Sequence, residues 1–231
     1  MKCIAILQSN YIPWKGYFDL INYVDEFVIY DDAQYTKRDW RNRNLIKTKD
    51  GLKWLTIPVE VKNKFKQTIR ETKVTNSNWI NQHLKTLKYS YSKADCYNEM
   101  IEWINKIYLQ CEKEVFLSDI NLHLINEIVK FLGIKTRISF STDYIIEGNR
   151  SEKIMNICLQ AGAEVYLSGP AAKSYLDLAA FDKERINVKW MNYSGYKEYP
   201  QVYPPFVNEV SIIDLILNTG IDSIKYLNFF K

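Results

Sequence analysis

The sequence predicts an α/β fold in which a Rossmann-like, mainly parallel sheet has helices on both faces. Short apolar runs of strand type alternate with helical segments towards both ends of the chain. The first strand, helix and strand fit into about thirty residues, the usual size of a βαβ unit. The middle of the chain combines a hairpin turn signal with several successive helices. We therefore expect one α/β domain over residues 1–231, with an antiparallel and helical insertion at about 33–133.

The opening βαβ unit is assigned from apolar patterning. The run at 3–8 is continuously apolar, as in a buried strand, and residues 15–24 place Phe18 and Ile21 on one helical face. A second buried strand follows at 25–32. Two strands joined by such a crossover should be parallel neighbours with a right-handed connection.

The inserted segment begins with a hairpin signal, the Asp50-Gly51 turn, inside residues 44–61. A further strand is expected at 68–75. Asn76 or Ser77 then precedes three helical stretches. These are expected at 79–91, 97–112 and 119–132, and Gly133 is placed to end the last one.

The α/β rhythm returns after the insertion. Strands are expected at 135–142, 163–169 and 186–193. The helices between and after them are expected from a Ser151 cap to Ala161, after Pro170, and from a Ser211 cap to Asn218 with Gly220 just beyond.

The composition excludes several classes of protein. Four cysteines stand far apart without a CxxC pair and there are two histidines, so neither a zinc site nor a disulfide framework is indicated. No bound metal or flavin is expected. The N-terminal apolar run is too short for a signal peptide, and no run reaches the roughly 18 apolar residues of a spanning helix. We expect a cytoplasmic protein with no membrane span.

Positive charge is concentrated between Lys37 and Arg70. This stretch holds eleven basic and three acidic residues, a local net charge of +8, which leaves −4 for the rest of a chain whose total is +4. Such a concentration suits an anionic partner. A solvated loop is the alternative for the cluster from Lys62 to Lys66. No RNA or DNA fold signature is present, so nucleic acid is not an expected partner.

Three polar clusters fall at the carboxyl ends of expected strands, where open α/β sheets bind ligands. They are Gln8 to Tyr11, Asp31 and Asp32 with Gln34, and Ser168 with Gly169. The amide of Gln8 must find a partner if it is buried, or cost about 1–3 kcal/mol. For Tyr11 and Trp14, core packing is the alternative. The chain lacks GxGxxG, P-loop and GxSxG signatures, which disfavours standard dinucleotide, Walker and serine hydrolase sites.

The stretch from 31 to 44 has the densest chemistry. Asp31 and Asp32 could bind a metal or act as a general base, and Arg41 and Arg43 could contact phosphates. A loop held by internal salt bridges is the alternative. His83 lies at helical spacing from Trp79, where a satisfied structural histidine is the alternative to a catalytic one.

With these residues in view, the chain resembles the WbqC-like family, bacterial proteins often encoded among genes for O-antigen and other surface polysaccharides. The segments that resemble the family are QSNYIPWKGYF, DDAQYTKRDWRNRN, NWINQH and YLSGPAAKSYLD. Ser9 stands where the family commonly has proline, which alters the turn.

The resemblance implies transfer of an acyl or aminoacyl group, such as glycyl, to an amino sugar. The implied partners are a nucleotide-linked or lipid-linked amino sugar and an activated acyl donor such as an acyl carrier. Asp32 or His83 is the candidate base, with Asp31 a third catalytic candidate. The residues that the resemblance and the strand-end position favour for binding are Gln8, Tyr11, Trp14, Gln34, Arg41, Asn42, Arg43, Asn44, Ser168, Gly169 and Tyr175.

Two alternatives stay open. A nucleotidyltransferase-like enzyme fits the strand-turn-helix opening but lacks the His-x-Gly-His signature. A non-catalytic nucleotide-sugar-binding protein of the same pathway is the other.

Overall fold

A five-stranded, wholly parallel sheet forms the centre of the computed structural model, which describes residues 1–228. Its strands are β1 (Cys3–Leu7), β2 (Glu26–Ile29), β5 (Arg137–Phe140), β6 (Val165–Ser168) and β7 (Asn187–Trp190). They lie in the order β5-β2-β1-β6-β7, so the direction of winding reverses between β1 and β6. This is a doubly wound order, and it confirms the expected fold class.

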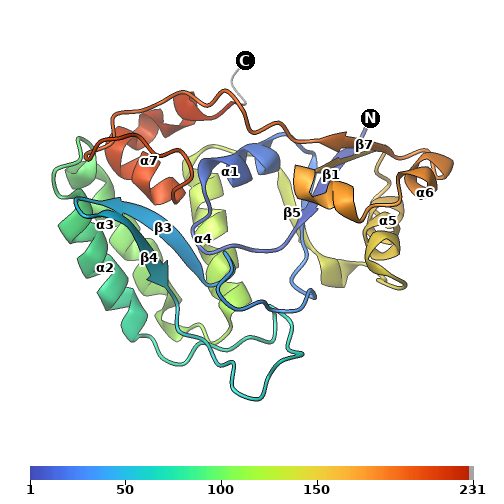
Figure 1. Ribbon diagram of the computed structural model, residues 1–231, viewed down its shortest axis with the longest axis horizontal. Helices are drawn as coiled ribbons and strands as arrows, with labels where there is room; N and C mark the ends of the chain where they lie inside the picture. The colour runs from blue at the N-terminus through green and yellow to red at the C-terminus, as the bar shows by residue number, and fades with distance from the viewer. Residues whose placement is uncertain (229–231) are drawn as a thin grey trace.

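Helices cover both faces of the sheet (Figure 1). They are α1 (Lys15–Asn22), α2 (Asn78–Tyr91), α3 (Tyr97–Leu109), α4 (Leu117–Phe131), α5 (Arg150–Gln160), α6 (Leu178–Lys183) and α7 (Ile212–Thr219). Neighbouring strand residues point to opposite faces, so Ala5 and Phe27 pack in the core with α1 and α4, whereas Ile4, Ile6 and Val28 pack with α5 and α6.

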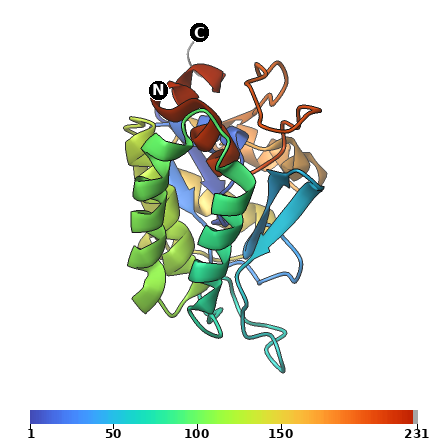
Figure 2. The same cartoon turned by 90° about the vertical axis from the view of Figure 1, so that its left-hand side faces the viewer.

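The segment between β2 and β5 holds the predicted hairpin and helices. Strands β3 (Arg43–Thr48) and β4 (Gly51–Thr56) pair antiparallel around a turn at Gly51, which has φ +105°. Helices α2, α3 and α4 stand side by side, with the hairpin next to α2 (Figure 2).

The prediction of a strand at 68–75 is wrong, because this segment forms only isolated β-bridges and no continuous strand. Thr68 exchanges hydrogen bonds with Glu71, and the Thr72 amide donates to the Ile69 carbonyl, so local turns take the backbone groups that a ladder would need.

Helix ends agree with the sequence in part. Ser211 caps α7 by accepting from the Ile213 amide, and Gly133 follows α4 with φ +69°. Asn149 rather than Ser151 caps α5, because its side chain accepts from the Ser151 and Glu152 amides and the Glu152 carboxylate accepts from the Asn149 amide. Pro170 begins a short 3₁₀ turn instead of an α-helix. Among the described residues, no helix has the length and apolar character needed to cross a membrane.

Candidate functional site

A crevice of about 530 Å³ opens at the carboxyl ends of β1 and β2, facing the start of α5. It lies next to the point where the strand order reverses, the usual ligand position in doubly wound sheets. Its polar and aromatic lining residues are Gln8, Tyr30, Asp32, Gln34, Asn149, Arg150, Lys153 and Tyr175. Four of these, Gln8, Asp32, Gln34 and Tyr175, are among the predicted site residues. We call this cavity the switch-point crevice.

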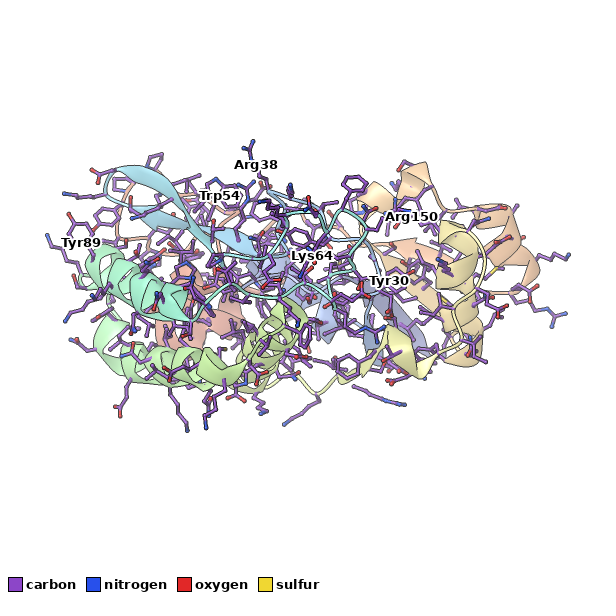
Figure 3. All side chains as sticks on the ribbon, turned by 90° about the horizontal axis from the view of Figure 1, so that it is seen from below. Tyr30, Arg38, Trp54, Lys64, Tyr89 and Arg150 are labelled. Carbon is purple, nitrogen blue, oxygen red and sulfur yellow. The ribbon has the colours of Figure 1, made fainter. Side chains whose placement is uncertain are left out.

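One side of the switch-point crevice is cationic. Arg150 and Lys153 come from the first turn of α5, where the positive end of the helix dipole adds to their charge while Asn149 caps the Ser151 and Glu152 amides. The Arg150 guanidinium lies over the Tyr175 ring, 3.5 Å from its centre, and Figure 3 shows Arg150 near Tyr30 on this side of the molecule. Stacking restricts where Arg150 can point. This wall is therefore suited to an anion such as a phosphate.

The other side of the switch-point crevice is made from the end of β2. The Asp32 carboxylate pairs with Arg70 and accepts a hydrogen bond from the Ser141 hydroxyl. The Asp32 side chain is nevertheless 24% exposed to solvent. Gln34 donates to the Phe65 carbonyl at 2.8 Å, which ties the crevice to the lysine-rich loop. The Asp32 carboxylate and the side-chain amides of Gln8 and Gln34 therefore line the same crevice as the cationic wall.

Asp31 lies outside this cavity although it is adjacent to Asp32 in sequence. Its buried carboxylate accepts from the Ser9 amide at 2.8 Å, from the Ser9 hydroxyl at 2.6 Å, and from the Ser118 hydroxyl. These bonds join the β1 loop, β2 and the start of α4. The geometry gives Asp31 a structural position.

His83 is buried among aromatic residues away from the lining of the switch-point crevice. Its Nδ1 and the Tyr108 hydroxyl each lie 2.8 Å from the Tyr11 hydroxyl. Burial lowers the pKa of His83 to about 4, although a hydrogen bond to the Thr56 backbone opposes the shift. With the other ring nitrogen donating to Thr56, Nδ1 accepts from Tyr11. Both ring nitrogens are then occupied within the core.

The candidates from 41 to 44 hold the neighbouring loops together. Asn44 donates to the carbonyls of Tyr11 and Ile12, and Ile12 has the unusual φ of +36°. Asn42 donates to the Ile57 carbonyl at 2.8 Å. These amides are committed to backbone partners in the structure.

The two arginines of this stretch also have partners. Arg41 donates to the Asn10 side chain. The Arg43 guanidinium lies 3.9 Å from the centre of the Trp54 ring and donates to the Arg38 carbonyl. Neither arginine lines the switch-point crevice, where Arg150 and Lys153 stand instead.

Three predicted residues lie elsewhere around the strand ends. Ser168 is buried and donates to the Tyr166 hydroxyl at 3.2 Å, and Gly169 follows it at the end of β6. Trp14 lines a different, smaller cavity, and its ring covers Gly16 so closely that a Cβ there would lie 2.3 Å from the indole.

The sequence did not indicate Arg150 and Lys153, because the residues between β5 and α5 have no clear apolar periodicity. The available signal was the capping box Asn149-x-x-Glu152, which marks a helix start behind a strand and so a candidate anion site.

Lys15 is a lysine whose side chain is buried outside the switch-point crevice. Burial lowers its pKa to about 8, against the attraction of Asp19 and Asp214. Its ammonium lies 4.8 Å from the centre of the Tyr196 ring and 5.2 Å from that of Tyr199. This cage comes from the segment before α7 and closes over the start of α1.

Residues 1–228 contain no group of three or more His, Cys, Asp or Glu side chains placed to hold a metal ion. The four cysteines are free thiols, and burial raises the pKa of Cys111 to about 12. That thiol therefore stays protonated and unreactive near neutral pH.

Comparison with known proteins places the chain in a family. Residues 8–226 match the WbqC-like protein family. The chain belongs to the WbqC-like family. It is 49% identical to the uncharacterized protein Rv1507c of Mycobacterium tuberculosis over 231 residues, which is the full length of both chains. No solved structure matches the chain.

Proposed function

We propose that this WbqC-like protein is a transferase that binds a phosphate-linked amino sugar in the switch-point crevice and acylates its amine. The observation that supports the proposal best is the composition of that crevice, in which a cationic wall of Arg150, Lys153 and the α5 N-terminus faces Asp32. The resemblance to proteins of surface-polysaccharide assembly supports an amino-sugar acceptor, nucleotide-linked or lipid-linked, in the cytoplasm.

Each wall of the crevice has a role in this reaction. Arg150 and Lys153 hold the phosphate, a role that the sequence had suggested for Arg41 or Arg43. The amine of the sugar attacks the carbonyl carbon of a thioester-type donor, the new C–N bond forms, and the thiolate leaves. Asp32 accepts the proton that the amine sheds. Its two oxygens have lone pairs beyond those engaged by Arg70 and Ser141.

Asp32 is preferred to His83 as the base because of access. The substrate cavity is lined by Asp32, whereas the imidazole of His83 is buried and hydrogen-bonded within the core. The amides of Gln8 and Gln34 are placed to contact sugar hydroxyls or the acyl oxygen.

Ligand binding is tested first by thermal shift with UDP-glucosamine, UMP, ATP with magnesium, and acetyl-CoA. A ligand present at 100 times its Kd should stabilise the fold by about 2.7 kcal/mol. The double variant Arg150→Ala/Lys153→Ala should weaken UDP-glucosamine binding at least tenfold. The control Lys85→Ala/Lys88→Ala removes two exposed charges from α2, away from the crevice, and should bind as the wild type does. Equal losses in both double variants would contradict the assignment.

Catalysis is tested with Asp32→Asn, which preserves size and removes the base. The expected result is retained sugar-nucleotide binding with N-acylated product, detected by mass spectrometry, reduced at least a hundredfold. Full activity in this variant would refute the role of Asp32. Binding without product in the wild type would favour a non-catalytic sugar-nucleotide-binding protein, and release of pyrophosphate from ATP would favour a nucleotidyltransferase.

A further inference from the structure

A second cavity, of about 250 Å³, is lined in part by the loop that follows β1. It is lined by Asn10, Pro13, Trp14, Trp40, Asn44 and Glu209. Gln8 and Asn10 are two residues apart, and they line the switch-point crevice and this pocket, respectively. We call it the tryptophan pocket. None of its lining residues belongs to the crevice.

The walls of the tryptophan pocket come from three segments that are fixed to one another. The Tyr11 amide donates to the Trp40 carbonyl at 3.0 Å, and the Ile212 amide donates to the Pro13 carbonyl at 2.9 Å. The Ser211 amide donates to the Leu45 carbonyl at 2.8 Å. These backbone bonds join the β1 loop, the hairpin and the start of α7. The pocket is therefore largely formed before any ligand arrives.

Two indoles supply the apolar surface. Trp14 is wedged between the rings of Tyr193 and Tyr196, at centroid distances of 5.2 and 5.6 Å, so its orientation is set. Trp40 packs against Trp54 at 5.2 Å and still has 42% of its surface exposed. The exposed part of the Trp40 side chain borders the preformed cavity.

Some polar groups that line the pocket already have hydrogen-bond partners within the protein, and others do not. The Asn44 amide is committed to backbone carbonyls, as described above. The Asn10 oxygen accepts from Arg41, whereas no described hydrogen bond uses its Nδ2 donors. Within residues 1–228, the Glu209 carboxylate has no hydrogen-bond or ion-pair partner that the structure resolves. An amide donor and a carboxylate acceptor thus remain beside the two indoles.

This combination matches the surface of a pyranose ring. The axial C–H groups of a hexopyranose form an apolar face that packs on an indole, while its equatorial hydroxyl groups donate to carboxylates and accept from amides. A phosphate is poorly matched, because Glu209 would repel it and no cation lines the cavity.

We infer that the tryptophan pocket is a carbohydrate site, separate from the switch-point crevice, that binds one hexopyranose unit. Trp40 and Trp14 stack on the ring, and Asn10 and Glu209 bind its hydroxyl or amino groups. Figure 3 shows Trp54, the neighbour of Trp40, well apart from Arg150 on the viewed face. The inference goes beyond the proposed acyl transfer and does not depend on it.

The test measures binding of free N-acetylglucosamine and glucosamine by saturation-transfer NMR and tryptophan fluorescence. Trp40→Ala should weaken both sugars at least tenfold, and Trp40→Phe should retain most of the binding because it keeps a stacking face. Trp54→Ala is the matched control: it removes an indole of the same cluster, 39% exposed, that does not line the pocket. It should bind within about twofold of the wild type, a margin typical of a non-contacting position.

Two further variants test the role of the Glu209 charge and the independence of the tryptophan pocket from the switch-point crevice. Glu209→Gln should weaken glucosamine, which carries an ammonium, more than N-acetylglucosamine. Arg150→Ala/Lys153→Ala removes cations that do not line the tryptophan pocket, so the affinities for the two free sugars should stay as in the wild type, whereas its weakened UDP-glucosamine binding reports on the phosphate wall of the crevice. Absence of sugar binding by the wild type, equal binding by folded Trp40→Ala, or loss of free-sugar binding in the crevice variant would each overturn the inference.

Discussion

The buried position of His83 predicts that the stability of the fold depends on pH in a way set by this one side chain. Its ordinary pKa is 6.5, and burial lowers the folded value to about 4. The unfolded chain therefore takes up the proton first as the pH falls. Because the folded pKa is the lower one, the stability is complete above about pH 6.5 and is lost as the pH drops toward 4.

The size of the effect follows from these two values. At pH 5.5 the unfolded imidazole is about nine-tenths protonated, whereas the folded one is almost wholly neutral. Linkage then removes roughly 1 kcal/mol of unfolding free energy between pH 7.5 and 5.5, and roughly 2–3 kcal/mol by pH 4.5. The upper interval is the cleaner one, since ordinary carboxylates titrate below it.

Urea unfolding at pH 7.5 and 5.5 measures this difference directly. The wild type should lose roughly 1 kcal/mol between the two pH values, and His83→Gln, although less stable at both, should lose almost nothing. His123→Gln is the control, because it removes the other histidine of the chain and leaves the Tyr11, His83 and Tyr108 network intact. The same pH slope in wild type and His83→Gln would refute the assignment of a buried neutral imidazole. It would also reopen a catalytic role for His83.

Three further predictions concern groups around the strand ends. Gly16→Ala should destabilise the fold by about 1–3 kcal/mol, because its Cβ would clash with the Trp14 indole, whereas Gly169→Ala, with 3.8 Å to its nearest neighbour, should be tolerated in thermal melts. Asp31→Ala leaves buried donors without their acceptor, and calorimetry should show a loss of about 3 kcal/mol. Burial lowers the pKa of Lys15 to about 8, so the unfolding free energy should rise between pH 8 and 10 in the wild type but not in Lys15→Met.

The proposed function and the carbohydrate inference can fail separately. The switch-point crevice is probed with phosphate-bearing ligands and Arg150 variants, and the tryptophan pocket with free sugars and Trp40 variants. If both sites bind, the distance between them along the β1 loop is short, since only Ser9 separates Gln8 from Asn10. A glycan with one unit in each site would then be the natural acceptor to examine.

The sequence by itself determined the strands and the edge at which to look. Apolar runs located all five sheet strands, and Asp50-Gly51 located the hairpin, because these signals are local. Gln8, Asp32 and Gln34 could be placed near one cavity because the carboxyl ends of parallel strands share an edge.

The tertiary structure alone decided which polar side chains reach a ligand. Asp31 and Asp32 are indistinguishable in sequence, but successive residues leave a strand on opposite sides, so Asp31 meets Ser118 and Asp32 faces the crevice. Arg150 enters the same crevice from more than a hundred residues away. Local patterns cannot specify such partners, because they depend on how distant segments pack, and this packing also buries His83 in the core.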